Sequence, residues 1–399
     1  MPFNKKIDDI PVGSGLMHSY STLYKEELLR NILPFLLKHS PDPEHGGYYT
    51  CLDREGKVFD TDKFVWLQGR QVWCFSFMYK EVEPRSEWLE MALSGAEFLE
   101  KYGRDPEGNW YFSLTEDGKP LVQPYNIFSD CFACMAFSAL YKIRPEPRYK
   151  EIALQTFSNI IKRQHNWKGQ YNKIYPGTRV LKNFSLPMIL CNLALEMEAI
   201  VGSTRVEEMI PGIIHQVMEV FYQPSLGLIL ENVNPDGSMN NSFEGRLTNP
   251  GHAIEAMWFI MDLGKRMGDS DLIDKAVEIM LQTLQYGWDD EFGGIFYFLD
   301  VMGHPPQQLE WNQKLWWVHA EALVALAKGY AFTHDERCAR WFKKVHDYTW
   351  KHFRDEEFGE WYGYLDRRGD PLLALKGGKW KGCFHIPRAL YQVWKTLEK

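Results

Sequence analysis

One phrase recurs six times along this chain, and it restricts the possible folds more than any other feature of the sequence. Each copy has a glycine-containing turn, a short run rich in aromatic residues and a second tight turn, and successive copies start about 60 residues apart. Asp-Gly and Arg-Gly pairs suit the positive φ of a tight turn, so each copy predicts a β-hairpin or an extended loop. The copies are HGGYYTCLDREGK from His45, EGNWYFSLTEDGK from Glu107, LGLILENVNPDGS from Leu226, FGGIFYFLDVMGH from Phe292, FGEWYGYLDRRGD from Phe358 and, more weakly, KGQYNKIYPGTR from Lys168.

Two helical stretches lie between consecutive copies of the phrase. The stretch before each copy has charges at three- and four-residue spacing, which is typical of a helix with one face in solvent. The stretch after each copy is poor in charge and rich in small and aromatic residues, so other helices must cover most of its sides. The first kind covers residues 20–38, 86–102, 147–164, 205–222, 270–286 and 336–352. The second kind covers residues 64–79, 127–141, 184–200, 252–267, 313–330 and 382–397.

Six outer–inner helix pairs predict an all-α fold, an (α/α)6 barrel with the six short β-hairpins around the mouth of a central cavity. An open helical solenoid is the alternative, but inner helices that are apolar on most sides favour a closed ring. Since no linker rich in proline or serine interrupts the repeat, residues 1–399 are expected to form a single domain.

Composition narrows the possible partners and the cellular location. A net charge of -8 and a pI near 5.9 argue against nucleic acid or an anionic membrane as the partner. The first residues contain no apolar signal region, and no stretch is long and apolar enough for a transmembrane helix. Seven cysteines, an odd number scattered through helical segments, suit reduced thiols. We therefore expect a cytoplasmic protein with a small, neutral ligand.

A few polar residues break the apolar pattern near the starts of the inner helices, where a barrel would point them into the cavity. Each has an ordinary structural interpretation, because a single histidine in an apolar helix is more often a hydrogen-bonded packing residue than a catalyst. His252 and His385 favour a functional interpretation, because closure of the ring would bring both side chains to the same depth in one cavity. The set comprises Gln68, Arg70, His252, Glu255, Trp317, His319, Glu321, His385 and Arg388, with Arg246 on the approach to His252.

Two histidines on opposite sides of a substrate carbon can remove a proton from one face and return one to the other, which inverts the stereocentre. A nearby arginine can stabilise the oxyanion that develops as the proton leaves. Glu255, three residues after His252 on the same helix face, is expected to fix the tautomer of that histidine. Trp258, Trp316 and Trp317 suit stacking on a sugar.

Other motifs in the sequence are weaker. His252-x-x-Glu255 resembles half of a carboxylate metal site, but it has no second copy, so no metal is expected. Two basic loops could hold phosphate, although each also reads as an ordinary connection between elements. One contains Lys168, Lys173, Arg179 and Lys182, and the other is GGKWKG at residues 377–382, with Lys379 and Lys381.

Four segments closely resemble the N-acylglucosamine 2-epimerases, the family that includes the renin-binding protein. They are FVWLQGRQVW, NPGHAIEAMWFIMD, PPQQLEWNQKLWW and LKGGKWKGCFHIPRAL, and the resemblance runs from about residue 20 to the C-terminus. It implies a six-hairpin helical barrel and the interconversion of N-acetyl-D-glucosamine and N-acetyl-D-mannosamine by proton transfer at C2 of the open-chain sugar.

The resemblance also implies roles for single residues. The two catalytic histidines of the family fall on His252 and His385, its active-site arginine on Arg70 and its cavity glutamates on Glu255 and Glu321. Arg246 and Trp317 match positions that contact the sugar. The family is typically a homodimer and is activated by ATP that is not consumed, which would give a role to Lys168, Lys173, Arg179, Lys379 and Lys381.

Related cellobiose 2-epimerases and aldose–ketose isomerases share the barrel and the histidine pair. The cellobiose enzymes carry a further histidine on the third inner helix, which here reads FSLPMILCNLALEMEA, and this difference favours an N-acyl sugar. Two other classes of protein stay open. An inverting glycoside hydrolase would use Glu255 and Glu321 as carboxylates about 6.5–9.5 Å apart, and a non-enzymatic protein would use the barrel only to bind.

Overall fold

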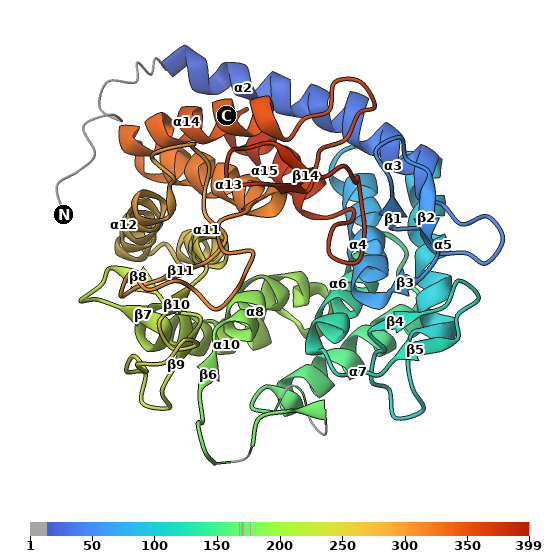
Figure 1. Cartoon of the computed structure of the whole chain (residues 1–399). Coiled ribbons are helices and arrows are strands. Elements are labelled where there is room, and N and C mark those ends of the chain that lie inside the picture. Colours follow the sequence, from blue (N-terminus) through green and yellow to red (C-terminus); the bar gives the residue numbers. More distant parts are fainter. Residues whose placement is uncertain (1–13, 167, 169–170, 176, 399) are drawn as a thin grey trace.

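The structure of the chain is a computed structural model, and it describes residues 14–166, 168, 171–175 and 177–398. Its helices form a closed double ring, with the inner helices around a central cavity (Figure 1). The inner helices are α4 (Val65–Glu81), α6 (Ile127–Ile143), α8 (Ser185–Glu196), α11 (Pro250–Met267), α13 (Trp316–Thr333) and α15 (His385–Leu397). The outer helices are α2 (Ser14–Glu27) with η1 (Leu28–Ile32) and α3 (Leu33–His39), α5 (Ser86–Tyr102), α7 (Pro147–Arg163), α10 (Ser203–His215) with η3 (Gln216–Phe221), α12 (Ser270–Gly287) and α14 (Glu336–His352).

Aromatic contacts between the first and last inner helices close the ring. Phe77 on α4 packs against Tyr391 on α15 with ring centroids 4.8 Å apart, and Trp73 on α4 packs against Phe384, the residue before α15, at 5.2 Å. The predicted (α/α)6 barrel is therefore confirmed, and the open solenoid is wrong. No helix in the described part of the chain has the length and apolar character needed to cross a membrane.

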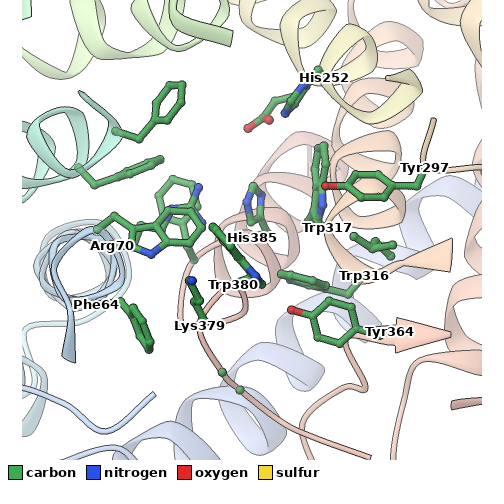
Figure 2. A pocket seen from close by; sticks show the side chains of 18 of the residues that line it. Phe64, Arg70, His252, Tyr297, Trp316, Trp317, Tyr364, Lys379, Trp380 and His385 are labelled. Carbon is green, nitrogen blue, oxygen red and sulfur yellow. The ribbon is translucent and has the colours of Figure 1, made fainter. Parts of the chain in front are cut away.

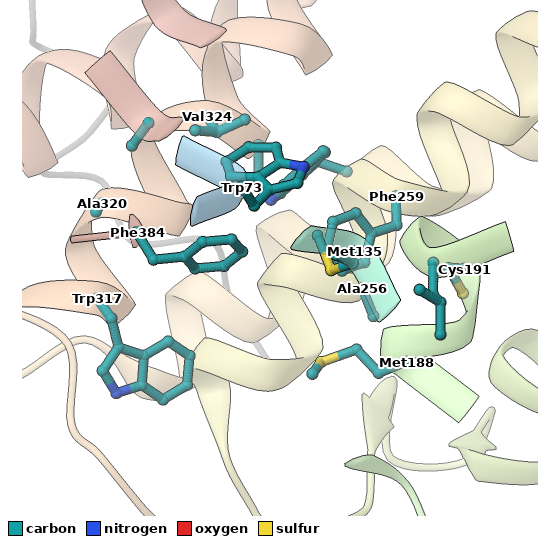
Figure 3. Close-up of a cluster of buried hydrophobic side chains, with 14 of the residues drawn as sticks. Trp73, Met135, Met188, Cys191, Ala256, Phe259, Trp317, Ala320, Val324 and Phe384 are labelled. Carbon is teal, nitrogen blue, oxygen red and sulfur yellow. The ribbon is translucent and has the colours of Figure 1, made fainter. Parts of the chain in front are cut away.

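Burial along the helices explains why the two rings formed from these sequences. Every residue of α13 from Trp316 to Gly329 is buried, as an inner helix covered on all sides requires. On α14, buried side chains such as Cys338, Trp341 and Val345 recur at helical spacing and leave a charged outer face. Side chains from several inner helices meet in the core of the barrel (Figure 3).

Some helix boundaries differ from the predicted ones. The third inner helix was expected over residues 184–200, but α8 ends at Glu196 and the short α9 (Glu198–Val201) follows. The last two inner helices were expected from residues 313 and 382, and they begin at Trp316 and His385 instead. In the first of these, residues 314–315 are taken up by a strand pairing.

The strands link neighbouring repeats as well as forming hairpins within them. A strand just before an inner helix pairs antiparallel with a strand of the next repeat: β3 with β4, β6 with β9, β10 with β11 and β12 with β13. The bridge between Asp53 and Leu375 joins the last repeat to the first. These pairings hold the N-terminal ends of the inner helices around one cavity mouth. The strands involved are β3 (Lys63–Phe64), β4 (Ser113–Leu114), β6 (Lys182–Asn183), β9 (Asn232–Val233), β10 (Leu247–Thr248), β11 (Leu299–Asp300), β12 (Lys314–Leu315) and β13 (Tyr364–Leu365).

Hairpins form within most of the repeated phrases, but not all. They pair β1 (Cys51–Leu52) with β2 (Val58–Asp60), β4 with β5 (Pro120–Val122), β7 (Tyr222–Gln223) with β8 (Leu228–Ile229), and β13 with β14 (Pro371–Leu373). The weak third copy, residues 168–179, has no strand in its described part, and residues 169–170 and 176 lie outside the description. In the fifth copy, from Phe292, the strand β11 pairs only with β10 of the preceding repeat among the strands that the structure describes. The prediction of six hairpins was therefore wrong for the third and the fifth copies.

Candidate active site

A cavity of about 880 Å³ opens among the N-terminal ends of the inner helices, and all six of these helices contribute to its wall. Its lining is mainly aromatic and aliphatic, with a small number of charged groups. Figure 2 shows the two histidines, Arg70 and Trp317 directed into this one cavity. The convergence that the sequence predicted for His252 and His385 is therefore present.

His252 sits in the first turn of α11 because of its local sequence, Asn-Pro-Gly-His. The side chain of Asn249 caps the helix by accepting a hydrogen bond from the backbone N–H of His252 at 3.1 Å, and Pro250 occupies the first helical turn. The Nδ1 atom of His252 lies 3.1 Å from both carboxylate oxygens of Glu231. This contact leaves Nε2 as the nitrogen available to a substrate.

Glu231 reaches His252 because its backbone is fixed between two neighbouring repeats. Its carbonyl accepts the N–H of Phe184 at 2.9 Å, and its own N–H donates to the carbonyl of Leu247 at 2.9 Å. Burial lowers the pKa of His252, but the Glu231 carboxylate raises it by more, and the resulting pKa lies above that of an ordinary imidazole. His252 therefore holds a proton more readily than an ordinary imidazole does.

The expected partner of His252 was wrong. Glu255 lies on the cavity wall, but its carboxylate accepts a hydrogen bond from Arg388 of α15 and not from His252. Helical spacing brought Glu255 near the histidine, yet a buried guanidinium competes for its oxygen more strongly. Sequence reasoning missed Glu231, although an acid inside the apolar run of the fourth phrase, LGLILENVN, was a usable signal.

His385, in the first turn of α15, has a carboxylate partner of its own. Its Nδ1 lies 2.7 Å from Oε1 of Glu321, which also accepts from Arg388 at 2.7 Å, while Oε2 accepts from Trp258 Nε1 at 2.9 Å. Burial, together with the positive charge of Arg70, holds the pKa of His385 well below its usual value. His385 is therefore neutral at physiological pH.

The pKa values of the two imidazoles are thus shifted in opposite directions, and both imidazoles lie beside Trp317. The ring centroid of Trp317 lies 5.2 Å from that of His252 and 5.6 Å from that of His385. A pair of titratable groups whose environments separate their pKa values is the usual arrangement for an acid and a base that act together. The site can therefore offer a proton donor and a proton acceptor to one substrate at the same pH.

Arg70 is a buried cation among aromatic rings. Its guanidinium carbon lies 4.0 Å from the ring centroid of Phe132, 4.3 Å from that of Trp66 and 4.8 Å from that of Phe384. Burial lowers the pKa of Arg70 to about 9, so it stays largely protonated at neutral pH. Its Nε finds no hydrogen-bond partner among the described residues. Arg70 also lines the cavity, so its positive charge suits an oxyanion that develops there.

Several polar residues named from the sequence are structural. Gln68 accepts the N–H of Tyr48 at 2.9 Å and donates to the carbonyl of the same residue at 2.7 Å. His319, fully buried, accepts the N–H of Ile295 at 3.0 Å, and its other nitrogen lies 2.8 Å from the carbonyl oxygen of Leu315. Both side chains tie an inner helix to a copy of the repeated phrase, which is the ordinary interpretation the sequence allowed.

The structure does not place Arg246 in the cavity wall. Its Nε donates to Asp300 at 2.9 Å and its Nη1 to Asn241 at 2.8 Å, so it joins β10 to β11 at the rim. A contact between Arg246 and a sugar stays a prediction.

The five basic residues predicted for nucleotide binding do not gather in one place. Lys381 is buried, donates to Glu360 and to the carbonyl of Lys376, and anchors the end of its loop. That side chain cannot reach a nucleotide, so its assignment was wrong. Lys379, in contrast, is exposed and lines the mouth of the cavity. The other three lie in the segment between α7 and β6, where Lys173 and Arg179 are exposed, Lys168 is half-buried and Arg179 pairs with Glu244 at 3.2 Å.

Two carboxylates and a histidine form a cluster at the inner end of the site. Atoms of Glu255, Glu321 and His385 all lie within 4.8 Å of one another. One nitrogen of Arg388 donates to both glutamates, so this guanidinium supplies the positive charge that a metal ion would bring. The two carboxylates are also closer than the 6.5–9.5 Å of an inverting glycoside hydrolase. The geometry does not fit the hydrolase alternative.

Comparison with known proteins identifies the family. Residues 47–389 match the family model of N-acylglucosamine 2-epimerase. The chain belongs to this family. The N-acylglucosamine 2-epimerase of Mus musculus is 40% identical over 380 residues, which cover 92% of this chain and 89% of the mouse protein. The Homo sapiens protein of the same name is 38% identical over 372 residues, with 91% and 86% covered.

Similarity at this level over almost the whole chain makes this protein an epimerase. Among solved structures, the epimerase resembles cellobiose 2-epimerase from Bacillus thermoamylovorans B4167, with a TM-score of 0.81 at 22% identity over 94% of this chain and 99% of that one. At this low identity, the structural similarity shows only that the two proteins share the barrel fold.

Proposed function

We propose that this epimerase interconverts N-acetyl-D-glucosamine and N-acetyl-D-mannosamine by removing and returning a proton at C2 of the open-chain sugar. His252 and His385 act as the acid–base pair. The observation that carries the proposal is that two imidazoles from distant helices face one cavity, each oriented by its own glutamate, with pKa values shifted in opposite directions. The N-acyl sugar itself is supported by the relatives named above.

Proton transfer follows from these protonation states. Neutral His385 takes the C2 proton through Nε2, the C–H electron pair becomes the C1–C2 double bond, and negative charge collects on O1. Arg70, a cation in the cavity wall, stabilises that charge. Protonated His252 then donates a proton to the opposite face of C2, which inverts the centre. The reverse reaction uses the same two groups with their roles exchanged.

Solvent exchange at C2 tests the reaction and the substrate together. We would incubate the enzyme with N-acetyl-D-mannosamine in deuterium oxide and follow the sugars by NMR. The expected result is N-acetyl-D-glucosamine carrying deuterium at C2. His252→Ala and His385→Ala should each lose nearly all turnover while keeping the circular dichroism spectrum of the wild type. Turnover that survives the loss of both imidazoles, or an absence of C2 label, would overturn the proposal.

ATP as an activator that is not consumed belongs to the same proposal, and its support is the resemblance to the family. Since Lys379 lies in the mouth of the sugar cavity, a nucleotide bound there would compete with substrate instead of activating the enzyme. The segment with Lys168, Lys173 and Arg179 is therefore the better candidate. Loss of ATP activation in a Lys173→Ala, Arg179→Ala double variant, with unchanged turnover in the absence of ATP, is expected, and retained activation would move the site elsewhere.

A homodimer and a cytoplasmic location complete the proposal, again on the strength of the resemblance. Light scattering coupled to gel filtration checks the first, with twice the chain mass of 46.8 kDa expected. Fractionation of the source cells checks the second.

A further inference from the structure

The third inner helix contributes one stripe of side chains to the cavity wall, and that stripe contains a single amide. Ser185, Met188, Ile189 and Asn192 of α8 all line the cavity, at the spacing expected for one face of a helix. Asn192 lies seven residues beyond Ser185, which places it about 10 Å deeper along the helix axis. Its side-chain amide has no hydrogen-bond partner among the residues that the structure describes.

Apolar side chains of the cavity wall lie at about the same depth as Asn192 on α8 and on the inner helices to either side of it. Met188 precedes it by one helical turn on α8, Met135 comes from α6 and Phe259 from α11, and all three line the same cavity and are buried. Figure 3 shows Met135, Met188 and Phe259 on neighbouring inner helices. This part of the cavity wall therefore combines a partly exposed amide, which can donate and accept hydrogen bonds, with apolar side chains.

The charged groups of the site lie elsewhere on the wall. Arg70, His252 and His385 come from α4, α11 and α15, and Glu255 and Arg388 bind each other. The cavity mouth carries other polar groups, including Asp60, Glu310 and Gln313, which suit the hydroxyl groups of a sugar chain. The pocket around Asn192 therefore differs in chemistry from both the catalytic groups and the mouth.

We propose that Asn192 recognises the amide of the substrate's N-acyl group, and that Met135, Met188 and Phe259 enclose the acyl carbon chain. This inference rests on the proposed function. The reacting carbon of an N-acyl sugar carries the only amide of the molecule, so a cavity that holds C2 between the histidines needs an amide partner and an apolar space close by. Asn192 and its three neighbours supply both, while the remaining carbons extend towards the polar mouth.

A series of acyl lengths tests the apolar part of this pocket. We would measure kcat/KM for N-acetyl-, N-propanoyl- and N-butanoyl-D-mannosamine with the wild type and with Met188→Ala. Removing the methionine side chain makes room for added methylene groups, so the ratio of kcat/KM for butanoyl over acetyl should rise about 10-fold or more. Ser185→Ala, on the same stripe of α8 but at the mouth, is the matched control and should leave this ratio unchanged. An equal ratio in Met188→Ala and wild type would overturn the apolar part of the pocket.

Binding of unreactive sugar alcohols tests the amide without relying on turnover. Asn192→Leu should weaken the binding of N-acetyl-D-glucosaminitol about 10- to 100-fold by calorimetry and leave that of D-glucitol, which lacks the amide, unchanged. Asn192→Ala, which adds no bulk, guards against a misfolded leucine variant. Equal effects on both alcohols would refute recognition of the amide. Failure of the proposed function looks different, because the wild type itself would then show no C2 exchange with any N-acyl sugar.

Discussion

Glu231→Gln is the sharpest test of how the site divides acid from base. Glutamine keeps the size of the side chain and can still accept a hydrogen bond from Nδ1 of His252, which now contacts both Glu231 oxygens at 3.1 Å. The substitution therefore removes the negative charge while keeping the orientation of the imidazole. Burial, which lowers the pKa of His252, is then no longer offset, so the pKa must fall.

The size of that fall follows from the energy of the lost interaction. A hydrogen bond to a charged partner contributes about 1.5–3 kcal/mol, and one pKa unit corresponds to about 1.4 kcal/mol. The pKa of His252 should therefore drop by about 1–2 units. Because His252 must be protonated to act as the acid, activity is lost as the pH rises through its pKa. The high-pH limb of the rate profile should move to lower pH by the same amount.

The assay is the pH dependence of kcat/KM, followed by C2 exchange in deuterium oxide. The low-pH limb reports His385, whose pKa lies well below the ordinary value, and it should not move in Glu231→Gln. Glu219→Gln is the matched control, because Glu219 forms a histidine–glutamate pair with His215 at 2.8 Å on the exposed outer surface. A high-pH limb that stays in place in Glu231→Gln would refute the assignment of His252 as the protonated partner.

Three further substitutions separate catalysis from stability. Arg70→Met should lower kcat about 100-fold or more while the melting temperature changes little, since the lost attraction to Glu255 and Glu321 is offset by removing the cost of burying a guanidinium; a large loss of stability in calorimetry would contradict this. His319→Leu should cost about 1–3 kcal/mol for each backbone group left unpaired and leave kcat of the folded enzyme nearly unchanged, which denaturant unfolding and the exchange assay can check. Lys381→Met should destabilise the protein by about 3–5 kcal/mol, because it leaves Glu360 as a buried unpaired charge; activation by ATP should persist, and its loss would return Lys381 to the nucleotide site.

The barrel could be predicted from the sequence because its signals are local. Helical spacing, apolar character and the repeated phrase are each visible within one repeat, and they fixed the inner helices to within a few residues. The pairing of strands across repeats is not visible in the same way, because strands of two residues carry almost no periodicity. Yet those pairings decide which hairpin residue reaches which helix.

The partners of the two histidines show where sequence reasoning reached its limit. Glu321 and His385 were both named, but 64 residues separate them and only closure of the ring brings them together. Spacing on one helix favoured Glu255 for His252, and Arg388, 133 residues away, binds that carboxylate instead. Glu231 was not named because its role depends on the backbone of a neighbouring repeat. Residue type and spacing in the sequence are enough to find the titratable groups. Their protonation depends on which charged side chains contact them in the folded protein.

The charges buried around the cavity explain why one proton is shared between two histidines. Glu231, Glu255 and Glu321 are buried carboxylates, and Arg70 and Arg388 are buried guanidinium groups. Three carboxylates and two guanidinium groups together carry one net negative charge, which a single protonated histidine neutralises. With both histidines protonated the site would be positive, and with neither protonated it would be negative. Asp60, Glu310 and Lys379 at the mouth are exposed and screened by solvent.

A buried net charge is costly, so the state with one proton on the histidine pair is the favoured one. Epimerisation moves a proton from C2 to one imidazole and from the other imidazole to C2, which leaves that total unchanged. The site therefore has the same charge before and after each turnover in either direction. It follows that neutralising any one of the five fixed charges should disturb the forward and reverse reactions together and leave their equilibrium ratio, which belongs to the sugars, as it was.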